Sequence, residues 1–506
     1  MLPLIVRQIP DLACQDLGLF QTVPLNLHSP SNHNQVIELM EQNLTIRNLT
    51  SLPILIERYE IHDRIQPIQS GGRFTNISHN VTSLFTSDSK APSLACRTAS
   101  SFSLRIEACS TCKVPVARAN LPQQILSLFL SVEEQQYQVN ILHARCHSQY
   151  LMRVDGRQDP DHKHITFYHP DHHHLLFAYR NSYKSWMQPL RDDSPLSCLS
   201  IPGTHNSPTY HKALPSVRCQ CVPVREQLRK GIRFLDIRVQ PLHHGLPLRA
   251  PILLVHSVFP ISLTGQHYFR SLVNEVLQFL EENPSETIIM SVKREGTGSC
   301  SDEHLSRILH LHYAHDDRKW FTAPRIPYLG EVRGKIVLFR RFRLDHSLAS
   351  QWGGTGWGID ASIWADNVPH SICPSGDVCF QDFYEVLETH NITEKIGFSI
   401  DHLKRAAGSE PPMTNAACHG KQPFHINFLT ASNFWKMGCW PDRIAAQINP
   451  AIVEYLCLQH NNPIDEDRPK GIGSTGIVIC DWVGDKGNWD IVRCVIGMNA
   501  PLERRS

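Results

Sequence analysis

Two histidines of this chain stand at the ends of short apolar runs. His205 follows the run at 199–201, and His256 follows directly on the run at 252–255. An imidazole changes its protonation state near neutral pH, so two facing rings can act as a general base and a general acid. A single histidine near a strand end is more often an ordinary hydrogen-bonded residue. The pair therefore predicts acid–base chemistry on the condition that the fold brings both rings to one place.

Charged side chains end most of the other apolar runs. The carboxylates are Asp236, Asp382 and Asp481, the cations are Arg238, Lys293, Arg340 and Arg341, and Tyr384 follows two positions after Asp382. So many charges around one opening are costly to hold together unless they bind a charged, hydroxylated ligand. The run ends therefore predict a site for such a ligand.

The apolar runs predict the scaffold that positions these side chains. Eight runs have strand length, at 199–201, 232–239, 252–255, 287–292, 335–339, 377–380, 424–428 and 476–480. Amphipathic segments at 224–230, 268–282 and 442–458 predict helices between some of them. Eight strands alternating with helices are typical of a (β/α)8 barrel, in which reactive residues lie at the carboxyl ends of the strands. We therefore expect an α/β barrel over residues 190–500.

A different pattern fills the first 185 residues. β-branched and aromatic runs alternate there with polar breaks, at 43–56, 103–108, 124–132, 136–143 and 164–168. Short strands at such spacing are typical of an all-β sandwich. Because 506 residues exceed the size of one hydrophobic core, we expect a smaller, sandwich-like accessory domain over 1–185 ahead of the barrel.

The charge balance restricts the partners. The chain has 49 basic and 48 acidic residues and a formal net charge of +1, which gives no long-range attraction to nucleic acid or to an anionic membrane. We expect no nucleic-acid partner and only local membrane contact.

The expected address is cytoplasmic, with peripheral contact to membranes. The amino terminus has no pattern typical of a secretory signal, and the 16 cysteines are interpreted as reduced thiols. Five Asn-x-Ser/Thr patterns argue for a secretory route instead, at Asn43, Asn48, Asn76, Asn80 and Asn391.

Four motifs of the second half resemble the X domain of bacterial-type phosphatidylinositol-specific phospholipase C. They are SIPGTH at 200–205, GIRFLDIR at 231–238, NPSETIIMSVK at 283–293 and GKIVL at 334–338. The resemblance does not extend to the first 185 residues. It implies a distorted TIM barrel that acts on an inositol phospholipid at the bilayer surface. In the implied reaction the inositol 2-hydroxyl attacks the adjacent phosphate, which releases diacylglycerol and a cyclic inositol phosphate.

The resemblance also implies roles for individual residues. His205 matches the general base, His256 matches the general acid, and Asp481 matches the carboxylate that holds the tautomer of the base. Asp236 and Arg238 match the residues beside the phosphate.

Further matches concern the headgroup and the cofactor. Lys293, Arg341, Asp382 and Tyr384 match positions that grip the inositol ring. Arg238 stands where calcium-dependent relatives hold their cation, so the resemblance implies an enzyme without metal or other cofactor.

One position departs from the bacterial pattern. Bacterial enzymes usually carry Asp directly after the base histidine, where it assists the acid histidine, and this chain has Asn206, which we include among the substrate-binding residues. An amide cannot stabilise an imidazolium by charge, so we expect a lower pKa for His256 and a weaker leaving-group step. Asn at this position also resembles the calcium-dependent branch. Two alternatives stay open: a weakly active or inactive module that binds a phosphoinositide or another partner, and a phosphodiesterase for a different headgroup.

Several tryptophans fall on loops after the fifth and seventh predicted strands. Indoles beside a lipid-cleaving site can insert into the membrane interface, and packing in the barrel rim explains any one of them equally well. These residues are Trp352, Trp357, Trp364, Trp435 and Trp440.

Overall fold

The computed structural model describes most of the second half of the chain and parts of the first. The described residues are 43–63, 96–114, 116, 124–142, 147–155, 164–179, 182–242, 251–409, 422–462 and 471–504. Every element below belongs to one compact unit that spans residues 41–506. Asn76 and Asn80 lie outside the described residues.

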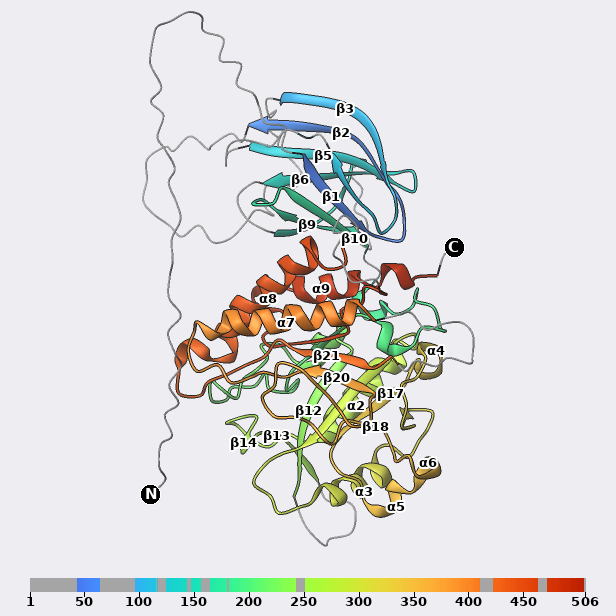
Figure 1. The fold of residues 1–506 in the computed structure, drawn as a ribbon, viewed down its shortest axis with the longest axis vertical. Coiled ribbons are helices and arrows are strands. Elements are labelled where there is room, and N and C mark those ends of the chain that lie inside the picture. Colours follow the sequence, from blue (N-terminus) through green and yellow to red (C-terminus); the bar gives the residue numbers. More distant parts are fainter. Residues whose placement is uncertain are drawn as a thin grey trace, which may run out of the picture. The chain divides into compact units, whose positions relative to one another are not determined.

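One large mixed sheet carries most of the predicted strands (Figure 1). In spatial order its parallel members are β17 (Ile336–Arg341), β15 (Ile288–Arg294), β12 (Phe234–Pro241), β11 (Ile201–Thr204), β22 (Ile477–Cys480), β21 (Phe424–Phe428) and β20 (Val378–Gln381). Each of these strands overlaps a run that the sequence predicts as a strand. Short strands flank the two ends: β16 (Trp320–Phe321) and β18 (Ile359–Asp360) pair with β17, and β19 (Ser371–Ile372) pairs with β20.

The predicted third barrel strand has a different role. β13 (Ile252–His256) pairs antiparallel with the end of β12 and continues into β14 (Phe259–Pro260), so the prediction of a parallel strand at 252–255 is wrong. A parallel partner would need a crossover of a dozen or more residues, and the link from Pro241 to Ile252 is shorter. Among the described strands no pairing joins β17 to β20. A closed eight-stranded barrel therefore stays a prediction.

The three predicted helices are present. α1 (Val224–Arg229), α2 (Phe269–Glu282) and α8 (Pro441–Leu458) match the amphipathic segments, and Pro441 starts α8 at a position where its missing N–H costs nothing. The structure adds three longer helices, α3 (Asp302–His312), α7 (Asn391–Ala407) and α9 (Asp490–Gly497), and three short ones, α4 (Leu329–Val332), α5 (His346–Ala349) and α6 (Gln351–Gly354). None of the helices in the described ranges combines the length and the apolar character that a membrane span needs.

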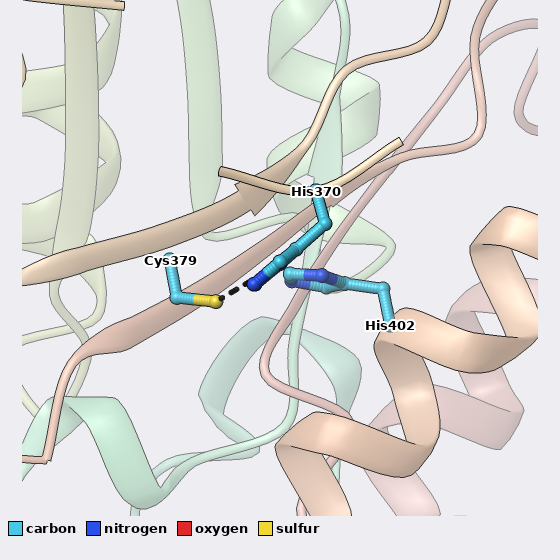
Figure 2. Close-up of side chains that lie close together, drawn as sticks. All are labelled: His370, Cys379 and His402. Atoms are coloured by element: carbon cyan, nitrogen blue, oxygen red, sulfur yellow. Dashed lines mark hydrogen bonds between the residues drawn. The ribbon is translucent and has the colours of Figure 1, made fainter. Parts of the chain in front are cut away.

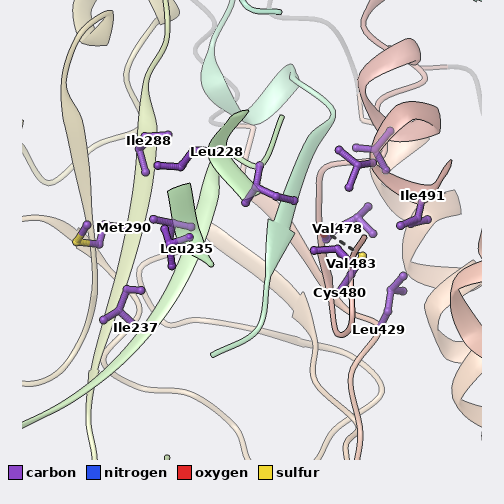
Figure 3. Packing of buried hydrophobic residues seen from close by; sticks show 14 of the residues in the cluster. Leu228, Leu235, Ile237, Ile288, Met290, Leu429, Val478, Cys480, Val483 and Ile491 are labelled. Carbon is purple, nitrogen blue, oxygen red and sulfur yellow. Dashed lines mark hydrogen bonds between the residues drawn. The ribbon is translucent and has the colours of Figure 1, made fainter. Parts of the chain in front are cut away.

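The two faces of the large sheet pack against different partners because side chains alternate along a strand. Leu235 and Ile237 of β12 and Met290 of β15 face the cluster that includes the helices (Figure 3). Phe234 of β12 and Ile289 of β15 point to the opposite face and join a second cluster. The position of a residue in this alternation therefore decides which face receives its side chain.

A fully buried ion pair fixes the backbone directly before β12. The Arg233 guanidinium donates to Glu286 at 2.7 and 2.9 Å, and both side chains have no exposed surface. Its remaining N–H groups donate to four backbone carbonyls: those of Tyr183, Lys184, Leu228 and Ile232. Such full satisfaction is what allows a buried charge to persist.

The strands of residues 44–179 form two five-stranded sheets. One has the order β4 (Thr111–Val114), β1 (Leu44–Leu49), β10 (His174–Tyr179), β9 (His164–His169) and β7 (His147–Tyr150). The other has the order β3 (Cys96–Ile106), β2 (Ile54–Asp63), β5 (Gln124–Val132), β6 (Gln135–Leu142) and β8 (Met152–Arg153). Side chains of both sheets share one buried cluster. That residues 1–185 form an independent all-β domain stays a prediction.

Hydrogen bonds join β1 to the C-terminal end of α8. The buried Arg47 guanidinium donates to the carbonyls of Leu456, Cys457 and His460 at 2.6 to 3.1 Å, where a helix favours a cation. Nearby, Asn48 is fully buried and its amide donates to the carbonyls of Leu52 and Glu107. Asn48 is therefore not accessible for glycosylation in this fold.

Candidate active site

The predicted site residues continue the inward face of the large sheet. In β12, β17, β20 and β22 an apolar residue of the inner cluster comes first and a charged residue follows two positions later on the same face. The pairs are Phe234 and Asp236, Phe339 and Arg341, Phe380 and Asp382, and Ile479 and Asp481. The apolar members form the floor and the charged members gather above it, at the carboxyl ends of the strands.

A cleft of about 480 Å³ opens at this end of the sheet. Most of the predicted site residues line it, namely His205, Arg238, His256, Lys293, Arg341, Asp382, Tyr384 and Asp481. A larger depression of about 620 Å³ lies along α8 and α9 and contains none of them. Charge and geometry, and not size, identify the smaller cleft as the candidate active site.

His205 is held by the carboxylate that the sequence assigns to it. Its Nδ1 lies 3.0 Å from Asp481 Oδ1, so a proton on Nδ1 leaves Nε2 free as an acceptor. Gln220 fixes the surrounding backbone by donating to the carbonyls of His205 and Cys480 at 2.8 and 2.9 Å. Burial, aided by the positive charge of Arg238, lowers the pKa of His205 well below its usual value. The imidazole is therefore neutral at physiological pH, as a general base requires.

His256 faces His205 across the cleft. The two ring centroids are 6.0 Å apart, and the rings are nearly perpendicular. Nδ1 of His256 lies 3.0 Å from the carbonyl oxygen of Val217, which directs its Nε2 away from that anchor. Burial and the charge of Arg238 lower the pKa of His256 to about 4. This imidazole is therefore neutral at pH 7.

Arg238 lies at the centre of the charged residues. It contacts Asp236 at 3.2 Å through Nε and Glu295 at 2.9 Å through a terminal nitrogen. Asp236 is completely buried and also lies 3.9 Å from Arg341. Burial alone would raise the pKa of Asp236, but the two guanidinium groups outweigh it and lower that pKa. Asp236 therefore stays ionised and fixes the orientation of Arg238.

Glu295 belongs to the site, and the sequence analysis missed it. Its carboxylate contacts both Arg238 and Lys293, the latter at 2.8 Å, and accepts a hydrogen bond from the backbone of Ser257, next to His256. These cations overcome the effect of burial and lower the pKa of Glu295 to about 2. The signal was available, since Glu295 follows Lys293 by two positions and shares its face of the strand.

The opposite wall of the cleft combines aromatic and charged groups. The Arg341 guanidinium lies 3.9 Å from the ring centre of Trp364, whose Nε1 donates to Asp382 at 2.8 Å. The hydroxyl of Tyr384 donates to Asp366 at 2.8 Å. Arg340, the neighbouring cation at the same strand end, points the other way and pairs with Asp360.

Asn206 is placed differently from the other predicted residues. It is completely buried, and its backbone N–H donates to Asp236 at 3.1 Å. Neither atom of its amide has a hydrogen-bond partner within the described part of the chain, and it does not line the cleft. Its φ of 42° lies in the left-handed region, which Asn tolerates better than most residues. The left-handed backbone thus explains why Asn suits this position. Its side chain does not reach the surface of the cleft.

The acidic groups of the cleft are already engaged. Asp236, Glu295 and Asp382 each lie within 4 Å of an arginine or lysine, and Asp481 contacts His205. The liganding atoms of His205, Cys219 and Asp481 lie close enough to surround an ion, but an ion there would displace the contact that holds the tautomer of His205. The residues fit an anionic ligand better than a metal ion.

Comparison with known proteins agrees with the motifs. The family model described as the phosphatidylinositol-specific phospholipase C X domain matches residues 192–342. A 1-phosphatidylinositol phosphodiesterase of Listeria monocytogenes is 34% identical over 167 residues, which are 31% of this chain and 48% of the relative. The protein of the same name from Staphylococcus aureus strain Newman is 25% identical over 345 residues, which are 63% of this chain and 95% of the relative. This chain thus spans about half of the first relative and nearly all of the second.

Solved structures of bacterial proteins also align. A double mutant of the phosphatidylinositol-specific phospholipase C from Staphylococcus aureus gives a TM-score of 0.49 at 24% identity, over 63% of this chain and 97% of that chain. The phosphatidylinositol-specific phospholipase C from Listeria monocytogenes gives 0.43 at 23% identity, over 63% and 99%. By the motifs and the sequence matches together, this chain carries a phosphatidylinositol-specific phospholipase C X domain of the bacterial type.

Proposed function

We propose that this protein cleaves the phosphodiester bond of phosphatidylinositol-type lipids by internal attack of the inositol 2-hydroxyl. One observation carries the proposal. The imidazoles of His205 and His256 face each other, and Arg238 lies among the charged residues of the same site, in contact with Asp236. His205 has its Nδ1 fixed by Asp481 and offers Nε2 as a base. His256 offers the second proton-transfer group on the other side of the space between them.

The proposed step balances in protons and bonds. Nε2 of His205 takes the proton of the 2-hydroxyl while its oxygen forms a bond to phosphorus. The bond from phosphorus to the glycerol oxygen breaks, and Nε2 of His256 gives that oxygen its proton. The products are diacylglycerol and a cyclic inositol phosphate, and Arg238 neutralises the charge that develops on the phosphoryl oxygens.

Burial and the positive charge of Arg238 together lower the pKa of His256. A phosphodiester anion bound between Arg238 and His256 offsets the charge of the guanidinium and so raises the pKa of His256. The bound substrate then favours the protonated form of His256, and the negative charge of Glu295 acts in the same direction.

Recognition of the headgroup falls to the opposite wall. Lys293 and Arg341 supply donors for hydroxyls, Asp382 supplies acceptors, and Tyr384 supplies a flat face for the ring. Arg238 provides the positive charge at the phosphate, so we propose a reaction that needs no metal ion.

The membrane contact that we propose is a short segment beside the cleft. Phe434, Trp435 and Met437 are exposed by 42, 90 and 65%, and they connect the cleft-lining residues Ser432 and Pro441. Exposed apolar side chains next to a lipid-cleaving site suit the bilayer interface. Trp357, by contrast, is buried, and the half-buried Trp364 packs against Arg341 in the wall of the cleft, so these two indoles are not part of the exposed segment.

We also propose a cellular address and an accessory domain for this protein. No disulfide joins any two of the cysteines whose side chains the structure describes, which supports the proposal of a reducing, cytoplasmic address with peripheral membrane contact. The two sheets of residues 44–179 support an accessory domain ahead of the catalytic one.

A headgroup comparison tests the proposed substrate. Vesicles of phosphatidylinositol and, separately, of phosphatidylcholine are incubated with the protein, and water-soluble phosphorus is measured with His205→Ala as the control. We expect release from phosphatidylinositol alone and none with the variant. Release from neither lipid would favour the non-catalytic binding module, and equal release from both would favour a different headgroup specificity.

A further inference from the structure

A second cluster of potential ligands lies on the outer face of the large sheet, under α7. His370 precedes β19, Cys379 lies on β20 and His402 lies on α7, and Figure 2 shows the three side chains pointing toward one another. One ligand atom from each lies within 4.8 Å of the other two. The three come from separate elements, so only the tertiary fold brings them together.

The outer face of the sheet is polar at this place, although it is apolar elsewhere. Cys379 and Gln381 of β20 face outward by the alternation that sends Phe380 inward, and His425 and Asn427 of β21 do the same. The facing side of α7 presents Lys395, Ser399 and His402, all completely buried and spaced as one helix face.

Most members of this polar layer form side-chain hydrogen bonds, and His402 differs from them. Gln381 contacts Lys395, Ser399 and Asn427 at 2.8 to 3.3 Å. Neither ring nitrogen of His402 meets a hydrogen-bond partner in the ranges that the structure describes, although its side chain is completely buried. A buried imidazole without partners is costly, and a metal ion would satisfy it.

The spacing of the atoms fits a tetrahedral ion. With a Zn–S bond of about 2.3 Å and a Zn–N bond of about 2.05 Å, tetrahedral geometry places sulfur and nitrogen about 3.6 Å apart. Nδ1 of His370 lies 3.8 Å from Sγ of Cys379. His425 stands nearest for a fourth position, with its ring centre 5.6 Å from that of His402 and its Nδ1 unpartnered among the described residues.

We propose that His370, Cys379 and His402 bind a zinc ion that fastens α7 to β20. Two imidazoles and a thiolate are ligands that zinc prefers, and calcium and magnesium prefer oxygen. The charge of Arg405 on the exposed side of α7 opposes a cation here, and the thiolate compensates for it. The site is structural: β20 continues into Asp382 and Tyr384, so the ion steadies the wall of the catalytic cleft without entering it.

Cobalt binding tests the proposal on the whole protein. The chelator-treated chain is titrated with Co²⁺ and then with Zn²⁺, and near-ultraviolet absorption is recorded. We expect a thiolate-to-cobalt charge-transfer band that saturates at one ion per chain and disappears when zinc replaces cobalt. Exposed histidines such as His172 bind cobalt without producing this band. Absence of the band at saturating cobalt overturns the proposal.

Three variants locate the site. Cys379→Ser and His402→Gln should each weaken zinc binding by at least about 100-fold, since even residues outside the coordination shell cost about 10- to 100-fold. Cys373→Ser is the matched control, because Cys373 is a buried thiol of the same hairpin that lies outside the cluster, and it should bind as the wild type does. Equal binding by all variants, or loss in Cys373→Ser alone, would refute the assignment. Should one variant not fold, the wild-type band and the other variant still decide.

Discussion

Replacement of Asp481 by Asn tests the proposed role of His205 most sharply. Asp481 Oδ1 lies 3.0 Å from Nδ1 of His205, and its side chain is only 3% exposed. Burial raises the pKa of Asp481 well above its usual value, and the full positive charge that appears at that distance when His205 takes a proton favours the ionised carboxylate. At an effective dielectric constant of about 20, the attraction is about 5 kcal/mol, which corresponds to about four orders of magnitude in rate. The Asn side chain keeps the shape and loses this stabilisation.

We expect Asp481→Asn to lower kcat by about 10³- to 10⁴-fold with little change in KM, because the charge on His205 exists in the transition state and not in the ground state. Initial rates on phosphatidylinositol vesicles measure both constants. Asp192→Asn is the control, since Asp192 forms exposed ion pairs with Arg333 and Arg504 away from the cleft. A kcat within about threefold of the wild type, in a variant with unchanged melting temperature, would refute the assignment of His205 as the base.

Four further outcomes are expected. Arg233→Met should cost about 3–5 kcal/mol of unfolding free energy in urea titrations, because it leaves a buried carboxylate unpaired; a loss below about 1 kcal/mol would contradict this. The imidazole of His256 should titrate near pH 4 by NMR in the free protein and at a higher pH with bound inositol phosphate; an unchanged midpoint would contradict the proposal that the substrate anion raises the pKa of His256. Burial lowers the pKa of Lys395 to about 7 from 10.5, so in that window the unfolded chain binds a proton that the folded chain has lost, and the unfolding free energy should rise with pH; Lys395→Met should remove the slope, and a slope that persists would count against it. Trp435→Ala should weaken vesicle binding by about 10- to 100-fold, from about 1.5–3 kcal/mol of lost apolar burial, whereas Trp352→Ala, which changes an exposed indole outside the cleft lining, should not; equal effects would locate the membrane contact elsewhere.

The sequence predicted the site better than the sheet that carries it. Apolar runs of strand length identified the strands, and the charged residues that end them identified the cleft, because parallel strands bring their carboxyl ends together. The run at 252–255 has the same apolar character as the parallel strands, and only the short link before it indicates an antiparallel pairing. Periodicity does not encode the direction of a strand.

Individual residues show which features of the structure local sequence patterns do not predict. Glu295 was within reach of the alternation rule and was missed because the motif ends at Lys293. Asn206 was predicted among the substrate-binding residues, and its burial and left-handed backbone follow from the turn after β11, which no pattern of residue types reveals. The cluster of His370, Cys379 and His402 joins a loop, a strand and a helix, and because these positions have no regular spacing along the chain, only the three-dimensional fold could show it.

The central claim is that His205 and His256 form a cyclic inositol phosphate without a metal ion in the cleft. The direct measurement is phosphorus NMR of the water-soluble product from phosphatidylinositol vesicles, in excess chelator and with the metal content of the protein recorded, for the wild type, His205→Ala and His256→Ala. We predict a cyclic phosphodiester signal for the wild type that persists in chelator and vanishes in His205→Ala, with strong loss in His256→Ala. Release of an acyclic monophosphate as the first product, or activity that appears only with added calcium, would contradict the account.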